Sequence, residues 1–198
     1  MGPSDVKLAA LIGSRICHDL ISPIGAINNG IELLEMTGES TGPEVDLISE
    51  SVGNASARIR FFRVAFGAAG EQDIGRSEAN SVLEDMMGGG RLTVDYYPIE
   101  SQPRGMVRLA FLSILCLEAA LPYGGHIEVS CTDGHWSLRG TAEKMNIDMS
   151  LWSVLADPAG MKDIAPSNVQ FALLPILAAE DGLRLFANIT DDMIQIKF

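Results

Sequence analysis

The pair His18-Asp19 is the part of the sequence best suited to covalent chemistry. A neutral imidazole carries a lone pair on one ring nitrogen, which can attack phosphorus or carbon, while a neighbouring carboxylate holds the proton of the other nitrogen. Pro23 follows five residues after the histidine, and a proline inside a helix removes a backbone donor and bends the chain. Such a pair also occurs on solvated surfaces, so on its own it leaves a purely structural role open.

The other candidates for chemistry are weaker. His126, Cys131 and His135 are close in sequence and are a possible zinc site, but the neighbouring sequence supplies no fourth ligand. A metal-dependent phosphohydrolase built around a His-Asp pair would need more than the three histidines that the chain contains. The three cysteines, which include Cys17 and Cys116, are odd in number and widely spaced, and this pattern indicates reduced thiols.

The pattern of residues 5–70 predicts two long helices that position the pair. Breaker residues cluster between Met36 and Pro43, which indicates a tight turn. At 100° per residue, one face of the first helix is apolar, and it comprises Ile16, Leu20, Ile24, Ile27, Ile31 and Leu34. His18 lies about 160° from that face. Its neighbours on the wheel are small or polar: Ser22, Gly25 and Asn29. We therefore expect the imidazole to point outward.

The second helix carries a heptad repeat of apolar residues, namely Val45, Ile48, Val52, Ala55, Ile59, Phe62 and Phe66. This spacing is typical of coiled-coil packing. Two antiparallel helices alone would leave much of the repeat in water, whereas two paired hairpins bury it in a four-helix bundle. We therefore expect residues 1–70 to form a dimerisation hairpin and the chain to form a homodimer.

The composition indicates a folded globular protein, with 47% apolar and 20% charged residues. The net charge is −12, which argues against nucleic acid and anionic membrane as primary partners. The longest nearly uncharged apolar stretch, residues 109–117, is about half of the roughly 20 residues needed to cross a bilayer. The first residues lack the apolar core of a signal peptide, so we expect a cytoplasmic location.

From residue 71 onward the pattern changes to short alternating runs separated by amphipathic segments. The runs predict strands at 91–97, 126–132, 183–189 and 193–198. The segments between them predict helices at 77–87, 104–121 and 166–181. The expected fold class is α+β, with the helical hairpin followed by an α/β sandwich over residues 71–198.

The segment HDLISP resembles the phosphoacceptor box of two-component histidine kinases, in which a histidine is followed by an acidic residue, a leucine, two variable positions and a proline. His18, Asp19, Leu20 and Pro23 match this box position by position. Ser22 stands where kinases often carry threonine or asparagine. The resemblance implies that His18 accepts a phosphoryl group with the help of Asp19, and that Ser22 and Pro23 support the pair.

Residues 71–198 lack the features that a kinase needs to bind ATP. The segment expected to hold an asparagine-rich box, residues 108–125, contains no asparagine and offers only Ser113 and Glu118 as oxygen ligands for magnesium. An Asp-x-Gly-x-Gly loop is also missing, and the glycine triplet at 88–90 precedes a predicted strand, as a turn would. We therefore expect no nucleotide binding and no autokinase activity.

A phosphoacceptor hairpin followed by a degenerate, histidine-kinase-ATPase-like α/β region is similar to the alphaproteobacterial histidine phosphotransferases of the ChpT type. The sharpest motif is HDLISPIGAINNGIELL, residues 18–34, and the likeness continues through residues 117–129 to the C-terminal strands. It implies a phosphorelay enzyme that moves a phosphoryl group from the receiver domain of a hybrid histidine kinase to the receiver domains of response regulators. It also implies no cofactor of the chain's own, because the receiver supplies the Mg²⁺.

Two other functions stay open at this point. One is a module that docks receivers or a kinase and regulates them without carrying phosphate. The other is a receiver phosphatase, for which Ser22 is poorly suited to orient a water molecule.

A receiver must dock around His18. Because the turn lies between residues 36 and 43, residue 61 is level with His18 in an antiparallel hairpin. Wheel angles turn Phe61 and Val64 outward. The sequence therefore predicts an exposed apolar and basic docking patch that steers an acidic receiver, made of Arg15, Ile21, Gly25, Arg60, Phe61 and Val64. The alternative is that these side chains pack against residues 71–198.

Overall fold

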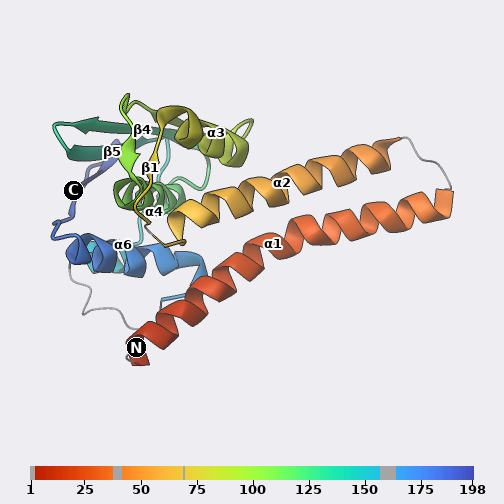
Figure 1. Ribbon diagram of the computed structural model, residues 1–198, viewed down its shortest axis with the longest axis horizontal. Coiled ribbons are helices and arrows are strands. Elements are labelled where there is room, and N and C mark those ends of the chain that lie inside the picture. The colour runs from red at the N-terminus through yellow and green to blue at the C-terminus, as the bar shows by residue number, and fades with distance from the viewer. Residues whose placement is uncertain (1–2, 38–41, 69, 157–163) are drawn as a thin grey trace.

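The computed structural model describes residues 3–37, 42–68, 70–156 and 164–198. Its longest elements are two antiparallel helices, α1 (Pro3–Thr37) and α2 (Pro43–Ala65), which extend away from the rest of the molecule as an arm (Figure 1). The predicted helical hairpin is confirmed, while residues 38–41 of the predicted turn lie outside the described residues. Helix α2 begins with a proline in its first turn, where the missing N–H leaves no hydrogen bond unmade.

Gly30 shows how closely the two helices approach. A Cβ atom at Gly30 would lie 2.6 Å from Cγ1 of Ile48 and 3.3 Å from the carbonyl oxygen of Glu44. The helices therefore touch almost backbone to backbone at this level, and the pairing of residue 30 with residue 48 fits the register predicted from the position of the turn. Pro23 lies within α1 and is buried.

The remaining residues form a mixed α/β region, here meaning residues 71–198. Its strands are β1 (Asp73–Ile74), β2 (Leu92–Tyr96), β3 (Gln102–Pro103), β4 (Gly125–Thr132), β5 (His135–Thr141), β6 (Phe186–Ile189) and β7 (Met193–Lys197). Its helical elements are α3 (Arg76–Met87), α4 (Arg104–Ala120), α5 (Met149–Ala156), the 3₁₀ turn η2 (Pro166–Asn168) and α6 (Val169–Glu180). Strands β1 and β3 form a small antiparallel pair.

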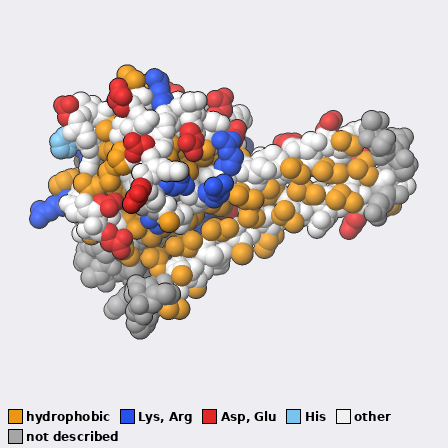
Figure 2. All heavy atoms as spheres, in the orientation of Figure 1, with side chains coloured by type: hydrophobic (Ala, Val, Ile, Leu, Met, Phe, Trp, Pro, Cys, Tyr) orange, Lys and Arg blue, Asp and Glu red, His pale blue; other side chains and the backbone are white. Residues whose placement is uncertain are grey.

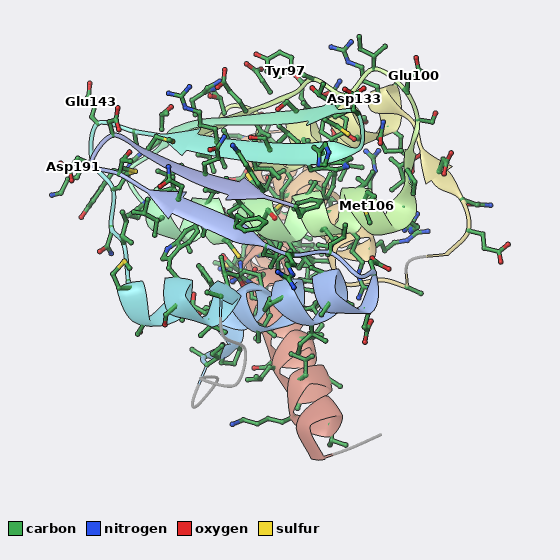
Figure 3. All side chains as sticks on the ribbon, turned by 90° about the vertical axis from the view of Figure 1, so that its left-hand side faces the viewer. Tyr97, Glu100, Met106, Asp133, Glu143 and Asp191 are labelled. Atoms are coloured by element: carbon green, nitrogen blue, oxygen red, sulfur yellow. The ribbon has the colours of Figure 1, made fainter. Side chains whose placement is uncertain are left out.

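The main sheet has the strand order β2-β4-β5-β7-β6, in which β2 and β4 are parallel and the other neighbours antiparallel. Figure 3 shows α4, whose first turn carries the labelled Met106, and α6 on the same side of this sheet. All residues of α4 from Leu109 to Leu117 are buried. The longest apolar stretch of the sequence is thus the central helix of the core.

The strands of the main sheet also contribute buried side chains to the core. The indole of Trp136 on β5 stacks on the ring of Phe198, with centroids 5.9 Å apart and an interplanar angle of 10°. Ile127, Leu138 and Ile196 from three neighbouring strands are also fully buried. The mixed helix and sheet architecture agrees with the predicted α+β class.

The predicted strands and helices of the α/β region are confirmed, with small shifts at their ends. Helix α5, strand β5 and the two-residue strands β1 and β3 were not predicted. Within the described ranges, none of the helices combines the length and apolar character that crossing a membrane requires.

Candidate phosphoacceptor site

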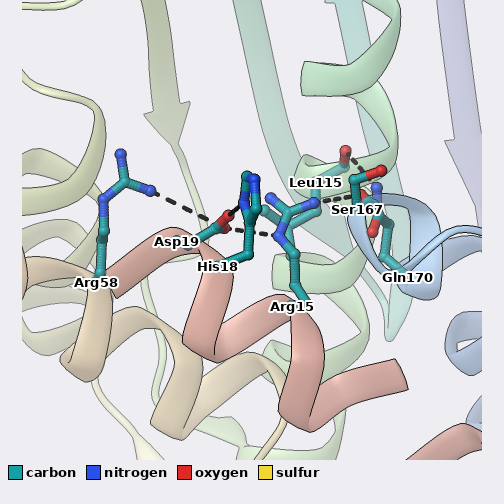
Figure 4. Close-up of polar contacts among 7 residues, drawn as sticks. All are labelled: Arg15, His18, Asp19, Arg58, Leu115, Ser167 and Gln170. Carbon is teal, nitrogen blue, oxygen red and sulfur yellow. Dashed lines mark hydrogen bonds and ion pairs between the residues drawn. The ribbon is translucent and has the colours of Figure 1, made fainter. Parts of the chain in front are cut away.

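His18 lies on α1 with its side chain directed away from the apolar face of the helix, as predicted. The side chain is 81% exposed, and its Nδ1 atom is 3.1 Å from Oδ1 of Asp19 (Figure 4). An ionised carboxylate can only accept hydrogen bonds, so this contact requires the proton of a neutral imidazole to be on Nδ1. The other ring nitrogen, Nε2, then carries the lone pair.

Asp19 is far more buried than its neighbour and is held by cations. Its side chain is 11% exposed, and Nε of Arg15 donates a hydrogen bond of 2.6 Å to its Oδ2 atom. Nη1 of Arg58 on α2 lies 4.0 Å from the same oxygen. Charge-assisted contacts of this kind are stronger than neutral ones and fix the orientation of the carboxylate. The bond from Arg15 therefore fixes the carboxylate that contacts His18, while Arg58 adds positive charge from the other helix without a hydrogen bond.

The α/β region reaches the same cluster through Arg15. Nη1 of Arg15 donates to the carbonyl oxygen of Ser167 in η2 (Figure 4). Gln170, one turn further along, is buried and donates from Nε2 to the carbonyl oxygen of Leu115 in α4 at 3.4 Å. Arg15 was predicted to bind a partner protein, and in the structure its guanidinium already has two partners within the chain.

Glu118 on α4 is a second acidic group near this site, besides Asp19. Burial raises the pKa of the Glu118 carboxyl, the positive charges of Arg15 and Arg58 lower it, and the negative charge of Asp19 raises it. The sequence analysis named Glu118 only as an oxygen ligand available to magnesium. It missed Arg58 as a neighbour of Asp19, although the helix register put residue 58 close to the level of His18.

Four of the predicted site residues lie on α1 next to His18. Ile21 and Ser22 are exposed, Gly25 is partly buried, and Pro23 is buried. Ile21 is 70% exposed, which is unusual for an isoleucine and leaves its apolar surface open to a partner. Of the docking patch predicted on α1, Ile21 is therefore accessible and Gly25 partly so, whereas the side chain of Arg15 is only 14% exposed.

The orientation predicted for the two apolar residues of the docking patch on α2 is wrong. Phe61 is completely buried and Val64 nearly so. The ring of Phe61 stacks on Phe111 of α4, with centroids 4.9 Å apart and an interplanar angle of 23°. The wheel placed these residues outward because it considered the hairpin alone, whereas α2 has a second apolar face that packs against α4. The alternative, packing against residues 71–198, is the one observed.

Arg60 is exposed but already paired. Its Nη1 atom donates to Oδ2 of Asp85, and its Nη2 atom lies 3.2 Å from Oγ of Ser81. Both partners belong to α3, so Arg60 bridges the hairpin and the α/β region. Its positive charge is largely neutralised there. The cation nearest the phosphoacceptor pair on α2 is Arg58.

The zinc alternative is excluded by the strand register. His126 pairs with Thr141 and His135 with Thr132, so the two histidines lie at opposite ends of the β4-β5 hairpin. Six strand residues at about 3.3 Å each separate them by roughly 20 Å, too far for a shared metal ion. The described ranges contain no group of three or more histidine, cysteine, aspartate or glutamate residues placed to hold a metal.

An apolar surface runs along the arm (Figure 2). Ile24 and Ile31 of α1 and Val52 and Ile59 of α2 are all between 44% and 49% exposed. At the base of the arm, this surface is hollowed into a groove of about 280 Å³. Apolar side chains line most of it: Ile12, Ile16, Ile59, Phe62 and Phe66. All of these residues except Ile12 belong to the two apolar faces predicted for the hairpin.

Comparison with known proteins identifies relatives over the whole chain. The family described as histidine phosphotransferase C-terminal domain matches residues 76–193. The protein phosphotransferase ChpT of Brucella abortus (strain 2308) is 33% identical over 198 residues, which cover 96% of this chain and 94% of that protein. A solved structure of a bacterial phosphotransferase superposes with a TM-score of 0.81 at 30% identity, covering 100% of this chain and 98% of that one.

Solved histidine kinases superpose less well. The kinase AdeS of Acinetobacter baumannii gives a TM-score of 0.41 at 9% identity, over 91% of this chain and 96% of that one, which is too low to establish a shared fold. The sequence relative and the matching domain family agree with each other and with the resemblance found in the phosphoacceptor box. The chain therefore belongs to the ChpT-type histidine phosphotransferases, enzymes of bacterial phosphorelays.

Proposed function

We propose that His18 is the phosphoryl carrier of this phosphotransferase. It accepts the group from an aspartate in the receiver domain of a hybrid histidine kinase and passes it to aspartates in response regulator receivers. The observation that carries the proposal is the combination of an 81% exposed imidazole with a neighbouring carboxylate that is itself fixed by Arg15. An accessible nucleophile with a fixed proton position is what transfer between two proteins requires.

The proposed reaction is an in-line displacement at phosphorus. Nε2 of His18 attacks the aspartyl phosphate of the receiver, an N–P bond forms, and the P–O bond to the receiver's carboxylate breaks. Nδ1 keeps its proton, so the phosphorylated ring is positively charged and Asp19 stabilises it. In the onward transfer the same proton allows a neutral imidazole to leave. Asp19 thus assists both directions.

The residues expected to hold nucleotide-bound magnesium do not fit that task. Ser113 is completely buried, and its hydroxyl donates to the carbonyl oxygen of Leu109 within α4 at 2.8 Å. Glu118 is partly buried, and the charges of Arg15 and Arg58 act on it. This arrangement supports a transferase that uses no ATP and no metal of its own, with the Mg²⁺ of the receiver neutralising the transferred group.

We also infer a homodimer in which two hairpins form a four-helix bundle, with residues 1–70 as the dimerisation and transfer domain and residues 71–198 as a degenerate ATPase-like domain. The half-exposed Val52 and Ile59 on α2 support the pairing, since burying such side chains is favourable by about 1.5–3 kcal/mol each when complete. Light scattering of Ile59→Asp should give a monomer where the wild type gives a dimer. A monomeric wild type at micromolar concentration would exclude the bundle.

The partners proposed here act in the cytoplasm, and we place this protein there with them. His18 and Ile21 stay exposed on the arm, so a receiver can approach them while the apolar face of the same hairpin is covered by a second copy.

The decisive experiment is transfer of radiolabelled phosphate from a phosphorylated receiver to the purified protein. Wild type and His135→Gln, which changes an exposed histidine far from the site, should both acquire label that is stable to alkali and lost in acid. His18→Gln should remain unlabelled. If the wild type binds receivers but never acquires label, the protein is a docking module instead.

A further inference from the structure

We propose that the α/β region sets the tautomer of His18 through Arg15, which is a positioning residue of the phosphotransfer reaction. The inference rests on the proposed function of His18 and adds a task for residues 71–198. The structure assigns this task through polar contacts that begin in the core at α4, pass along the backbone from Gln170 to Ser167, and end at the imidazole (Figure 4).

The series starts at Gln170, which is 1% exposed and whose Nε2 atom bonds the Leu115 carbonyl of α4. This contact attaches the start of α6, and with it η2, to the central helix. The Ser167 carbonyl of η2 then accepts a hydrogen bond from Nη1 of Arg15. Ser167 lies in the 3₁₀ turn that directly precedes the buried start of α6, so the α/β region holds one end of the guanidinium.

The other end of the guanidinium fixes Asp19. Nε of Arg15 bonds Oδ2 at 2.6 Å, which leaves Oδ1 to accept from Nδ1 of His18 at 3.1 Å. The planar guanidinium is suited to this bridge because its donors point in fixed directions. Asp19 cannot turn away from the imidazole without breaking its bond to Arg15.

Three charged groups face Asp19, one from each packed element: Arg15 from α1, Arg58 from α2 and Glu118 from α4. Of the two cations, only Arg15 is within hydrogen-bonding distance of the carboxylate, and its side chain is 14% exposed. Arg58 stands 4.0 Å away, and its side chain is 38% exposed. Arg58 contributes only positive charge near Asp19, whereas Arg15 also holds the carboxylate in one orientation. Substitutions at the two arginines therefore form a matched pair of tests.

The consequence is a specific protonation pattern. Holding the proton on Nδ1 keeps the lone pair on Nε2, the nitrogen that faces away from Asp19 and receives the phosphoryl group. If Asp19 were free to rotate, the Nε2–H form would be populated, and that form cannot attack through Nε2. The α/β region then acts on the reaction without touching the phosphoryl group.

The test measures the tautomer and the transfer rate in the same variants. In ¹⁵N NMR spectra of the full-length protein above the titration range of histidine, wild-type His18 should show the pattern of an Nδ1–H imidazole. Arg15→Gln should shift His18 toward the Nε2–H form and slow phosphotransfer about 10-fold, the lower end of the effect of losing a residue that orients a metal ligand. Arg58→Gln should leave the tautomer unchanged.

Two further variants separate the parts of the proposal. Arg15→Lys keeps a cation near Asp19 but cannot bridge to Ser167, so it should restore only part of the rate. Gln170→Met keeps the volume of the side chain and loosens the attachment of η2, so it should shift the tautomer in the same direction by a smaller amount. Circular dichroism spectra of each variant serve as the control for folding.

Unchanged His18 resonances in Arg15→Gln would overturn the proposal. A shift in Arg15→Gln with none in Gln170→Met would assign the effect to Arg15 alone and overturn the role of the α/β region. The NMR measurement does not depend on phosphate transfer. A wild type that fails to accept label would therefore overturn the proposed function while the tautomer result still stands.

Discussion

The contact between Phe61 and Phe111 makes a sharp prediction because the hairpin and the α/β region meet there. Phe61 is 0% exposed, stacks on Phe111 at 4.9 Å, and meets the ring of Phe62 edge-on at 6.3 Å and 81°. We predict that Phe61→Ala lowers the free energy of unfolding by about 4 kcal/mol, since truncating a buried phenylalanine costs roughly 3–5 kcal/mol. In a protein of this size, that loss corresponds to a fall in melting temperature of roughly 8–16 °C.

The assay is urea unfolding followed by circular dichroism, and the chain supplies a matched control. Phe186 on β6 is 64% exposed, so Phe186→Ala removes the same side chain from the surface and should change the free energy of unfolding by no more than about 0.5 kcal/mol. Phosphotransfer by the folded fraction of Phe61→Ala should stay close to that of the wild type.

The opposite pattern would refute the reasoning. If Phe61→Ala unfolded like the wild type but accepted phosphate slowly, Phe61 would be a docking residue, as its position on the helical wheel first indicated.

Three other predictions concern stability. Burial raises the pKa of Glu118 above its usual 4.5, so folding takes up a proton and the free energy of unfolding falls as pH rises from 4.5 to the raised pKa. Glu118→Gln removes this carboxyl and should therefore stabilise the protein at pH 7 but not at pH 4. Urea unfolding at the two pH values measures the difference. A Cβ atom at Gly13 on α1 would lie in open space, so Gly13→Ala should raise the free energy of unfolding by about 1 kcal/mol. Gly30→Ala should lower it, because the added Cβ would meet α2. Equal effects of the two substitutions would contradict the close approach of the helices at Gly30. A double-mutant cycle of Arg60→Ala and Asp85→Ala should give a coupling of roughly 0.2–1 kcal/mol, typical of exposed pairs, and a larger value would indicate a buried bridge.

The helices of the arm could be predicted because their signals are local. Periodic apolar residues and the breaker cluster after Met36 define α1 and α2, and the position of the turn fixes their register, which the contact of Gly30 with Ile48 reproduces. Placing His18 on the polar side needed only the wheel of one helix. The outward direction of the imidazole followed from the same information.

Strand β5 escaped prediction for a physical reason. Its inward positions are Trp136, Leu138 and Gly140, so the apolar alternation stops after two residues. The glycine is there because α4 packs directly on the strand: a Cβ atom at Gly140 would lie 3.2 Å from Cδ2 of Leu117. Helix α5 escaped prediction because a short apolar segment fits a strand or a helix equally well.

The partners of Arg15 and Phe61 were beyond sequence reasoning for another reason. Phe61 packs on Phe111, fifty residues further along the chain, and Arg15 bonds a backbone carbonyl at Ser167. A helical wheel describes only one helix and not what packs against it. A backbone carbonyl is present in every residue, so the residue type does not reveal that Ser167 is an acceptor. The sequence therefore predicted the proposed nucleophile, His18, and its partner Asp19, but not that Arg15 holds Asp19 in place.

The contacts between the arm and the α/β region suit the proposed role of His18 as a carrier that another protein phosphorylates. A chain that phosphorylated itself would have to bring its own ATP to His18, which requires a mobile link between the two parts. Here several contacts join the two parts: Arg60 bonds Asp85, and Arg104 at the start of α4 donates to the carbonyl oxygens of Arg63 and Ala68 at 3.1 and 3.3 Å. A histidine that receives its phosphoryl group from another protein needs no such motion. It gains from a rigid support, because a fixed carboxylate keeps the same nitrogen available to every receiver that docks.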